Sequence, residues 1–322
     1  MSNPVPRKTS ILCYSDSGVG KTTQFRYLSQ YVWERFQLKS RFICLDGGSL
    51  WSCVEDFVEQ GFVQPLQVPV TPEFNPFSTM KKLGRGMWPK DGIIHQPTAI
   101  APTKQGEAIR YKTNTEWLPL TPEIAAKIGL IGTDSLTGYS SALMYDQAAK
   151  NIRRGGEAGT VREEEGEQMG SNTQGHYGDT QNEVKNYVNA IVALPIPYAY
   201  FTALADGGTE NTSGVKRPVF GPQIAGSAAT GEMPKLVTNC FHLTAEGLGT
   251  ARVVKAFYED HPDPALPPNM KWKAKSSSLL PMQKMEFAKK FPNGFFPLSP
   301  ERGIRDFLDF RDMVDEALRE RK

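Results

Sequence analysis

Residues 15–23, Ser-Asp-Ser-Gly-Val-Gly-Lys-Thr-Thr, have the types and spacing of a phosphate-binding loop. They match the pattern G-x-x-x-x-G-K-[ST], except that Ser15 stands where the first glycine belongs. In such a loop small residues let backbone N–H groups converge on a phosphate, a lysine neutralises its charge and a hydroxyl binds Mg²⁺. Lys21 and Thr22 hold the last two positions. We expect the following residues to bind ATP: Ser17, Gly18, Val19, Gly20, Lys21, Thr22 and Thr23.

Magnesium in such a site also needs a second acidic element. Asp134 ends the apolar run Ile-Gly-Leu-Ile-Gly-Thr-Asp, and its carboxylate would hold the ion through the water shell. A strand also ends in Asp for reasons of turn formation alone. In combination with the phosphate loop, however, Asp134 and Thr22 are predicted to organise Mg²⁺.

Hydrolysis of ATP further requires a carboxylate that orients or deprotonates the attacking water. Asp46 ends the apolar run 41–46, and on a parallel sheet it would lie at the same edge as Lys21 and Asp134. The predicted catalytic set is therefore Lys21, Asp46 and Asp134. Glu73 is the alternative carboxylate, and a turn role for Asp46 is equally open. Thr202 either senses the γ-phosphate or is structural.

These residues need a scaffold that brings strand ends together. A short apolar run at 10–14 precedes the loop, and an amphipathic helical period runs from Lys21 to about Phe36. Further apolar runs at 41–46, 127–134 and 198–204 alternate with helical patterns, including one marked by Val184, Tyr187, Val188 and Ile191. Alternation of this kind predicts an α/β fold: a twisted, mostly parallel sheet with helices on both faces.

The remaining segments are less regular. We expect a Pro- and Gly-rich insertion at 84–122 with a hairpin within 94–117, long loops at 151–176 and 206–235, and antiparallel closing strands at 237–243 and 251–258. A final helix is predicted with Ser299 as its N-cap and Pro300 in its first turn, docked on the core or on a neighbouring subunit. The predicted division is a core at 1–260 and a basic C-terminal extension at 261–322.

Composition excludes several classes of protein. With 322 residues, 39% hydrophobic and 22% charged residues, the chain is predicted to be globular. A net charge of +2 does not by itself indicate a polyanionic partner. The four cysteines lack C-x-x-C spacing and the four histidines are scattered, so we expect neither structural zinc nor a disulfide framework. No apolar run of 18 residues or signal peptide is evident, which predicts a cytoplasmic protein that does not associate with a membrane.

The arrangement resembles the RecA-type ATPases, and within them the phage-encoded branch associated with single-strand annealing recombination. The resemblance rests on the phosphate loop, the run ending in Asp46-Gly47-Gly48 and the Thr-Asp-Ser-Leu-Thr segment at 133–137. It implies a RecA-like P-loop NTPase fold, with Asp46 as catalytic carboxylate. It also implies a homo-oligomeric ring or filament, located in the host cytoplasm, and single-stranded DNA held by the loops at 151–176 and 206–235.

RecA-like assemblies complete the ATP site with a basic residue from the next subunit, and Lys273 and Lys275 resemble that element. A solvated basic tail is the other interpretation. Two alternative functions stay open: a nucleotide-dependent assembly or packaging factor that does not bind DNA, and a P-loop kinase with Arg85 and Arg110 in a lid. The basic and aromatic residues available to DNA are Arg153, Arg154, Arg162, Tyr177, Lys216, Arg217, Phe220 and Lys235.

Overall fold

The computed structural model describes residues 7–45, 50–70, 76–96, 98–100, 110–112, 114–154, 162–164, 167–169, 174–212, 215–247, 252–262 and 270–320. Within these residues, six strands run parallel to their neighbours in the centre of the molecule. They are β1 (Thr9–Ser15), β2 (Lys39–Cys44), β3 (Val63–Gln67), β8 (Ile128–Asp134), β11 (Tyr198–Thr212) and β13 (Asn239–Glu246). β1 and β8 are buried along their whole length, as apolar runs in a covered parallel sheet should be.

Antiparallel strands are added to this sheet. In the described residues the order is β16-β14-β13-β1-β11-β8-β2-β3, with β12 paired to β11 and β15 paired to β13. The added strands are β12 (Val215–Pro222), β14 (Val253–Phe257), β15 (Lys275–Ser276) and β16 (Phe295–Leu298). The predicted closing strands are confirmed as the antiparallel pair β13 and β14.

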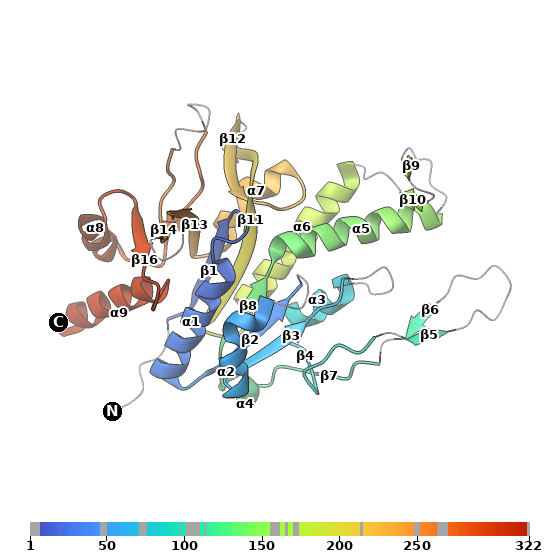
Figure 1. Ribbon diagram of the computed structural model, residues 1–322, viewed down its shortest axis with the longest axis horizontal. Helices are drawn as coiled ribbons and strands as arrows, with labels where there is room; N and C mark the ends of the chain where they lie inside the picture. The colour runs from blue at the N-terminus through green and yellow to red at the C-terminus, as the bar shows by residue number, and fades with distance from the viewer. Residues whose placement is uncertain are drawn as a thin grey trace.

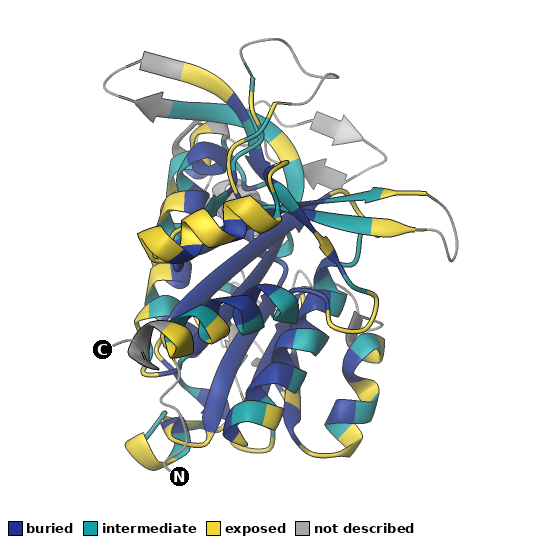
Figure 2. Ribbon diagram, turned by 90° about the vertical axis from the view of Figure 1, so that its left-hand side faces the viewer, coloured by how far each residue is buried: buried dark blue, intermediate teal, exposed yellow. Residues whose placement is uncertain are grey.

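Helices cover both faces of the sheet, which confirms the predicted α/β architecture (Figure 1). The bounds are η1 (Leu50–Val54), α1 (Lys21–Phe36), α2 (Glu55–Glu59), α3 (Pro76–Gly84), α4 (Pro122–Ala125), α5 (Leu136–Arg154), α6 (Gln174–Ala193), α7 (Ser227–Leu236), α8 (Pro281–Lys290) and α9 (Arg305–Glu320). Figure 2 shows the buried strands between helices whose outer faces are exposed.

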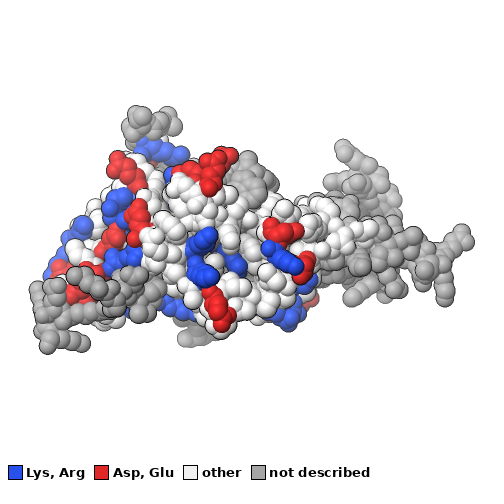
Figure 3. Space-filling view, turned by 90° about the horizontal axis from the view of Figure 1, so that it is seen from below, with Lys and Arg blue, Asp and Glu red and all other residues white. Residues whose placement is uncertain are grey.

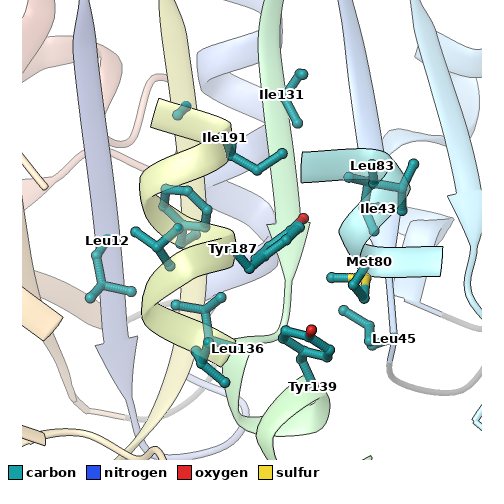
Figure 4. Close-up of a cluster of buried hydrophobic side chains, with 14 of the residues drawn as sticks. Leu12, Ile43, Leu45, Met80, Leu83, Ile131, Leu136, Tyr139, Tyr187 and Ile191 are labelled. Atoms are coloured by element: carbon teal, nitrogen blue, oxygen red, sulfur yellow. The ribbon is translucent and has the colours of Figure 1, made fainter. Parts of the chain in front are cut away.

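Two apolar cores result, one on each face of the sheet. The first packs α3, α5, α6 and α7 against the sheet, and Figure 4 shows Tyr139, Tyr187 and Ile191 within it, beside strand residues such as Leu12 and Ile131. The second packs α1, α8 and α9 on the opposite face, with side chains such as Phe25, Phe287 and Phe307. The predicted amphipathic face of α6 is confirmed, because Val184, Tyr187, Val188 and Ile191 are all buried.

The predicted insertion contains the predicted hairpin. β5 (Thr98–Ile100) and β6 (Arg110–Lys112) pair antiparallel, and a second ladder joins β4 (Trp88–Pro89) to β7 (Trp117–Leu118) nearer the body. In Figure 1 the β5–β6 pair projects from the sheet.

The prediction of a loop at 206–235 is wrong. β11 continues to Thr212, turns back as β12, and α7 follows directly. Two glycines of this segment permit close packing of α7. A Cβ on Gly221 would lie 2.8 Å from the carbonyl oxygen of Thr230, and a Cβ on Gly231 would lie 2.7 Å from that of Thr209. These glycines therefore mark a helix-on-hairpin contact.

The loop expected at 151–176 is shorter than predicted. α5 extends to Arg154 and α6 begins at Gln174, while β9 (Arg162–Glu164) and β10 (Glu167–Met169) form a small antiparallel pair between them. The other residues of this segment lie outside the described residues.

The final helix is present but begins later than predicted. Ser299 accepts a backbone hydrogen bond from Arg302 on its hydroxyl, 3.0 Å, and so caps a separate turn, and α9 starts only at Arg305. The helix docks on α1: Tyr31 donates to Asp312, and the N–H of Ile304 donates to Gln24, 2.9 Å. Elements after residue 260 thus pack on elements before it: β16 pairs with β14, and α9 packs on α1. The expected division at residue 260 stays a prediction.

Candidate phosphate-binding site

Residues 16–20 join the buried strand β1 to α1, as the phosphate-loop pattern predicts. Gly18 and Gly20 have φ angles of 75° and 102°, backbone conformations that L side chains rarely adopt. At Gly20, which has no side chain to cap a helix, the chain passes directly into α1. The first N–H groups of α1 and its positive dipole end thus face the loop, where an anion would be stabilised.

Lys21 is held tightly within this loop. Its side chain is 9% exposed, and its Nζ donates to the carbonyl oxygens of Ser15, 3.1 Å, and Asp16, 2.8 Å. Nζ also donates to Ser15 Oγ at 3.1 Å, and this hydroxyl donates to the carbonyl oxygen of Asp16. The serine that replaces the first glycine of the pattern therefore helps to hold the ammonium at the loop.

Asp134 receives hydrogen bonds on both carboxylate oxygens. Thr22 Oγ1 donates to Oδ2 over 2.6 Å, and Thr202 Oγ1 donates to Oδ1. Asp134 is 3% exposed and Thr202 is fully buried. A hydroxyl beside a carboxylate is a set of hard oxygen donors that fits Mg²⁺, and the predicted pair Thr22 and Asp134 is brought together here.

Sheet order and one glycine explain why these groups meet. β11 lies between β1 and β8, so Thr202 lies beside Cys13, immediately before the loop, and close to Asp134. α1 packs directly onto β8 at Gly132, where a Cβ would lie 2.4 Å from the ring of Phe25. Without a side chain at Gly132, the helix that carries Thr22 comes close enough for its hydrogen bond to Asp134.

Three residues that sequence reasoning missed support the loop. Tyr200 is buried, and its hydroxyl donates to the carbonyl oxygen of Lys21 at 2.6 Å; burial raises the pKa of this phenol well above its usual value. Cys53 Sγ lies 3.7 Å from the carbonyl oxygen of Thr22, and Arg252 donates to the carbonyl oxygen of Gly18 at 2.7 Å. The alternation of Tyr200 and Thr202 along one strand face was a signal available in the sequence.

Both candidate catalytic carboxylates, Asp46 and Glu73, lie outside the described residues. β2, which leads to Asp46, is in place: Cys44 is in register with Asp134, and the N–H of Leu45 donates to the carbonyl oxygen of Asp134 at 2.7 Å. The chain therefore leaves β2 beside Asp134.

The predicted trans-acting lysines have partners in their own chain. Lys273 forms ion pairs with Asp260, 2.6 Å, and Glu210, 3.1 Å. Burial lowers the pKa of Lys273, but these carboxylates outweigh it and raise the pKa above its usual value. Lys275 donates to the carbonyl oxygen of Lys235 at 3.4 Å, and burial lowers its pKa.

The residues that were predicted to bind DNA lie on the β11–β12 hairpin, in β9 and in α5, α6 and α7. Lys216 and Arg217 lie on β12, and Arg153 and Arg154 end α5. Two of the set already have partners, because Phe220 packs on Trp272 with ring centroids 4.8 Å apart and Lys235 pairs with Glu210 at 3.1 Å. The remaining members are Arg162 in β9 and Tyr177, which is 41% exposed in α6.

Other expectations concern absences. All four cysteines are free thiols. In the part of the chain that the structure describes, no group of three or more His, Cys, Asp or Glu side chains is placed to hold a metal ion. No helix among these residues is both long enough and apolar enough to cross a membrane. The lid arginines of the kinase alternative are separated in structure: Arg85 follows α3, and Arg110 begins β6 in the insertion.

Comparison with known proteins finds similarity to solved structures only, and it is remote. No protein-family model matches the sequence, and no curated protein matches it. Among solved structures, the chain is similar to the crystal structure of a KaiC-like protein from the hyperthermophilic archaeon Pyrococcus horikoshii, at 10% identity and a TM-score of 0.38, over 78% of each chain. A similarity this low carries no conclusion about activity.

Proposed function

We propose that this chain binds ATP with Mg²⁺ at the loop of residues 15–23 and hydrolyses it. The observation that carries the proposal is the convergence of Lys21, Thr22 and Asp134 at the ends of β1 and β8. The loop N–H groups and Lys21 would bind the phosphates and stabilise the charge that develops on them. Thr22 and Asp134 would hold Mg²⁺, which neutralises the phosphate oxygens when bound. Asp46 is our candidate for orienting water, with Glu73 as the alternative.

Thr202 has a different role in this proposal from γ-phosphate sensing. Its hydroxyl is committed to Asp134 Oδ1, so it would position the carboxylate that faces Mg²⁺. Ser15 would likewise position the Lys21 ammonium. Both are positioning residues, because they act through a neighbour.

We further propose a RecA-type protein that forms a homo-oligomer, acts on single-stranded DNA and belongs to a phage-type recombination or replication system. The support is local. β11 and β12 form a hairpin, and Lys216 and Arg217 lie on its second strand (Figure 1). Phosphate contacts by such cations make binding weaker as salt rises.

A nucleotide-dependent assembly or packaging factor is the second candidate. The observation that favours it is the neutralisation of Lys235 and Lys273 by Glu210 together with the packing of Phe220 on Trp272. These contacts engage one cation, Lys235, and one stacking surface, Phe220, of the set that would bind DNA, and they also neutralise Lys273 nearby.

One experiment separates the two. We would measure binding of a fluorescent single-stranded oligonucleotide at two salt concentrations, with wild type and a Lys216→Ala/Arg217→Ala variant, with Mg²⁺ and a non-hydrolysable ATP analogue. Salt-dependent binding that weakens in the variant supports the DNA function. Nucleotide-dependent oligomerisation without DNA binding would instead support the assembly factor.

A further inference from the structure

Arg41, in the first half of β2, is a buried cation without a counter-ion among the residues that the structure describes. It is 7% exposed, and in the described part of the chain no carboxylate lies within ion-pair distance of it. The other deeply buried arginine, Arg311, is 1% exposed and is neutralised by Asp312, with N–O distances of 2.7 and 2.9 Å. Of these two buried guanidinium groups, one has a carboxylate partner and the other has none within the described ranges.

The contacts of Arg41 hold its guanidinium but do not neutralise it. Nε donates to Gln64 Oε1 over 3.4 Å, and the guanidinium carbon lies 4.5 Å from the centroid of the Trp88 ring. Among the described residues, the two terminal Nη groups have no hydrogen-bond acceptor. Burial lowers the pKa of Arg41 to about 10, which reflects the cost of keeping this charge out of water. A planar guanidinium with both Nη groups available is the geometry that binds a carboxylate or a phosphate through two parallel hydrogen bonds.

A pocket of about 600 Å³ opens beside this guanidinium. Its polar lining includes Lys39, Arg41 and Lys90 against a single acidic side chain, Asp91, which is hydrogen-bonded to His95. Lys90 is already paired with Glu116, whereas Lys39 is exposed. The pocket is therefore positively charged, and its volume suits a small molecule.

Apolar side chains complete the pocket and separate it from the nucleotide site. Leu118, which is 40% exposed, lines it together with Pro65, Pro89 and Ile124. Arg41 precedes Cys44, the residue in register with Asp134, by three positions, so the two sites are about 10 Å apart along the strand. The face around α2, α4, β4 and β7 in Figure 1 is the one seen from below in Figure 3, where Lys and Arg side chains lie near its centre with Asp and Glu side chains beside them.

We propose that this pocket binds the oxyanion group, phosphate or carboxylate, of a small ligand, with Arg41 as the residue that grips it. The ligand would supply to Arg41 the negative charge that Asp312 supplies to Arg311. Its less polar part would lie against the prolines and Leu118, with Lys39 at the rim. The site does not depend on hydrolysis at the phosphate loop and is distinct from it.

The test measures thermal unfolding of the Lys21→Ala protein, so that the phosphate loop is disabled in every sample. Inorganic phosphate is titrated at constant ionic strength, and acetate is titrated in parallel. Arg41→Met removes the charge while keeping the volume similar, and Arg85→Met is the matched control because Arg85 is exposed and does not line the pocket. If the proposal holds, phosphate or acetate raises the Tm in a saturable way, on the order of 5 °C at a concentration of about 100 Kd.

The variants make the result decisive. We expect Arg41→Met to unfold at the same or a higher temperature without anion, because an unpaired buried charge is removed, and to lose the saturable shift, while Arg85→Met retains it. Arg41→Lys keeps the charge but not the two parallel donors, and should weaken binding at least tenfold. A shift by phosphate but not acetate identifies a phosphate ligand, and the reverse identifies a carboxylate. No saturable shift with either anion, or an equal shift in Arg41→Met, would overturn the proposal.

Discussion

Removing the hydroxyl of Thr202 tests whether this residue positions Asp134. Thr202 is fully buried and donates to Asp134 Oδ1, while Thr22 donates to the other carboxylate oxygen. Thr202→Val keeps the shape of the side chain and removes only this donor. In this variant the Asp134 carboxylate stays buried and keeps the hydrogen bond from Thr22, but it loses the one from Thr202.

The expected magnitude follows from the charge on the acceptor. A hydrogen bond to a charged group contributes about 1.5–3 kcal/mol, so Thr202→Val should lower the free energy of unfolding by roughly that amount. Thr180 is the matched control, because it is also fully buried but donates to the sulfur of Met144, a weak acceptor, over 3.2 Å. Thr180→Val should cost less than about 1 kcal/mol.

Urea unfolding of four proteins measures the interaction directly. Wild type, Thr202→Val, Asp134→Asn and the double variant form a cycle, and we expect a coupling energy of about 1–2 kcal/mol between the two positions. The Mg²⁺ concentration for half-maximal ATPase should also rise in Thr202→Val. Additive effects in the cycle, with Thr202→Val no more destabilising than Thr180→Val, would refute the positioning role.

Two further predictions concern packing and charge. Gly132→Ala places a Cβ 2.4 Å from Phe25 and should cost about 1–3 kcal/mol in urea unfolding and raise the Mg²⁺ concentration for half-maximal ATPase. Gly178→Ala, with nothing within 4 Å of its Cβ, should do neither. Burial raises the pKa of Glu210, but the combined effect of Lys235 and Lys273 is larger and opposite. The pKa of Glu210 is therefore lowered from its usual value of 4.5. Its contribution to stability should be complete above about pH 4.5 and lost as pH falls through the lower folded value, and Glu210→Gln should flatten that acid limb of the stability curve; an unchanged limb would contradict the ion-pair assignment.

The place of the 15–23 loop between a strand and a helix, and the approach of Thr22 to Asp134, could be predicted from the sequence because both follow from local patterns. The spacing of residues 15–23 between an apolar strand and an amphipathic helix specifies the loop, and a run that ends in Asp134 specifies a carboxylate at the same sheet edge. The hydrogen bond of Thr22 to Asp134 confirms this pairing.

Other features depend on tertiary contacts that local patterns do not encode. Gly221 and Gly231 resemble loop glycines in sequence, but in the structure each lies under a backbone group of a neighbouring element. Ser299 has the residue type of an N-cap, yet it closes a separate turn before α9. That no described carboxylate lies beside Arg41 becomes visible only once β2, β3 and β4 are assembled, because a sequence does not show which charged groups lie close together.

The most direct test of the central claim is steady-state ATP hydrolysis by the purified protein with and without Mg²⁺, compared with Lys21→Ala. We expect a Mg²⁺-dependent rate that falls by at least a hundredfold in Lys21→Ala, because the lysine would stabilise the charge on the phosphates. Urea unfolding of both proteins checks that the variant is folded, since Lys21 also donates to the carbonyl oxygens of Ser15 and Asp16. A folded Lys21→Ala protein that hydrolyses ATP at the wild-type rate would contradict the account.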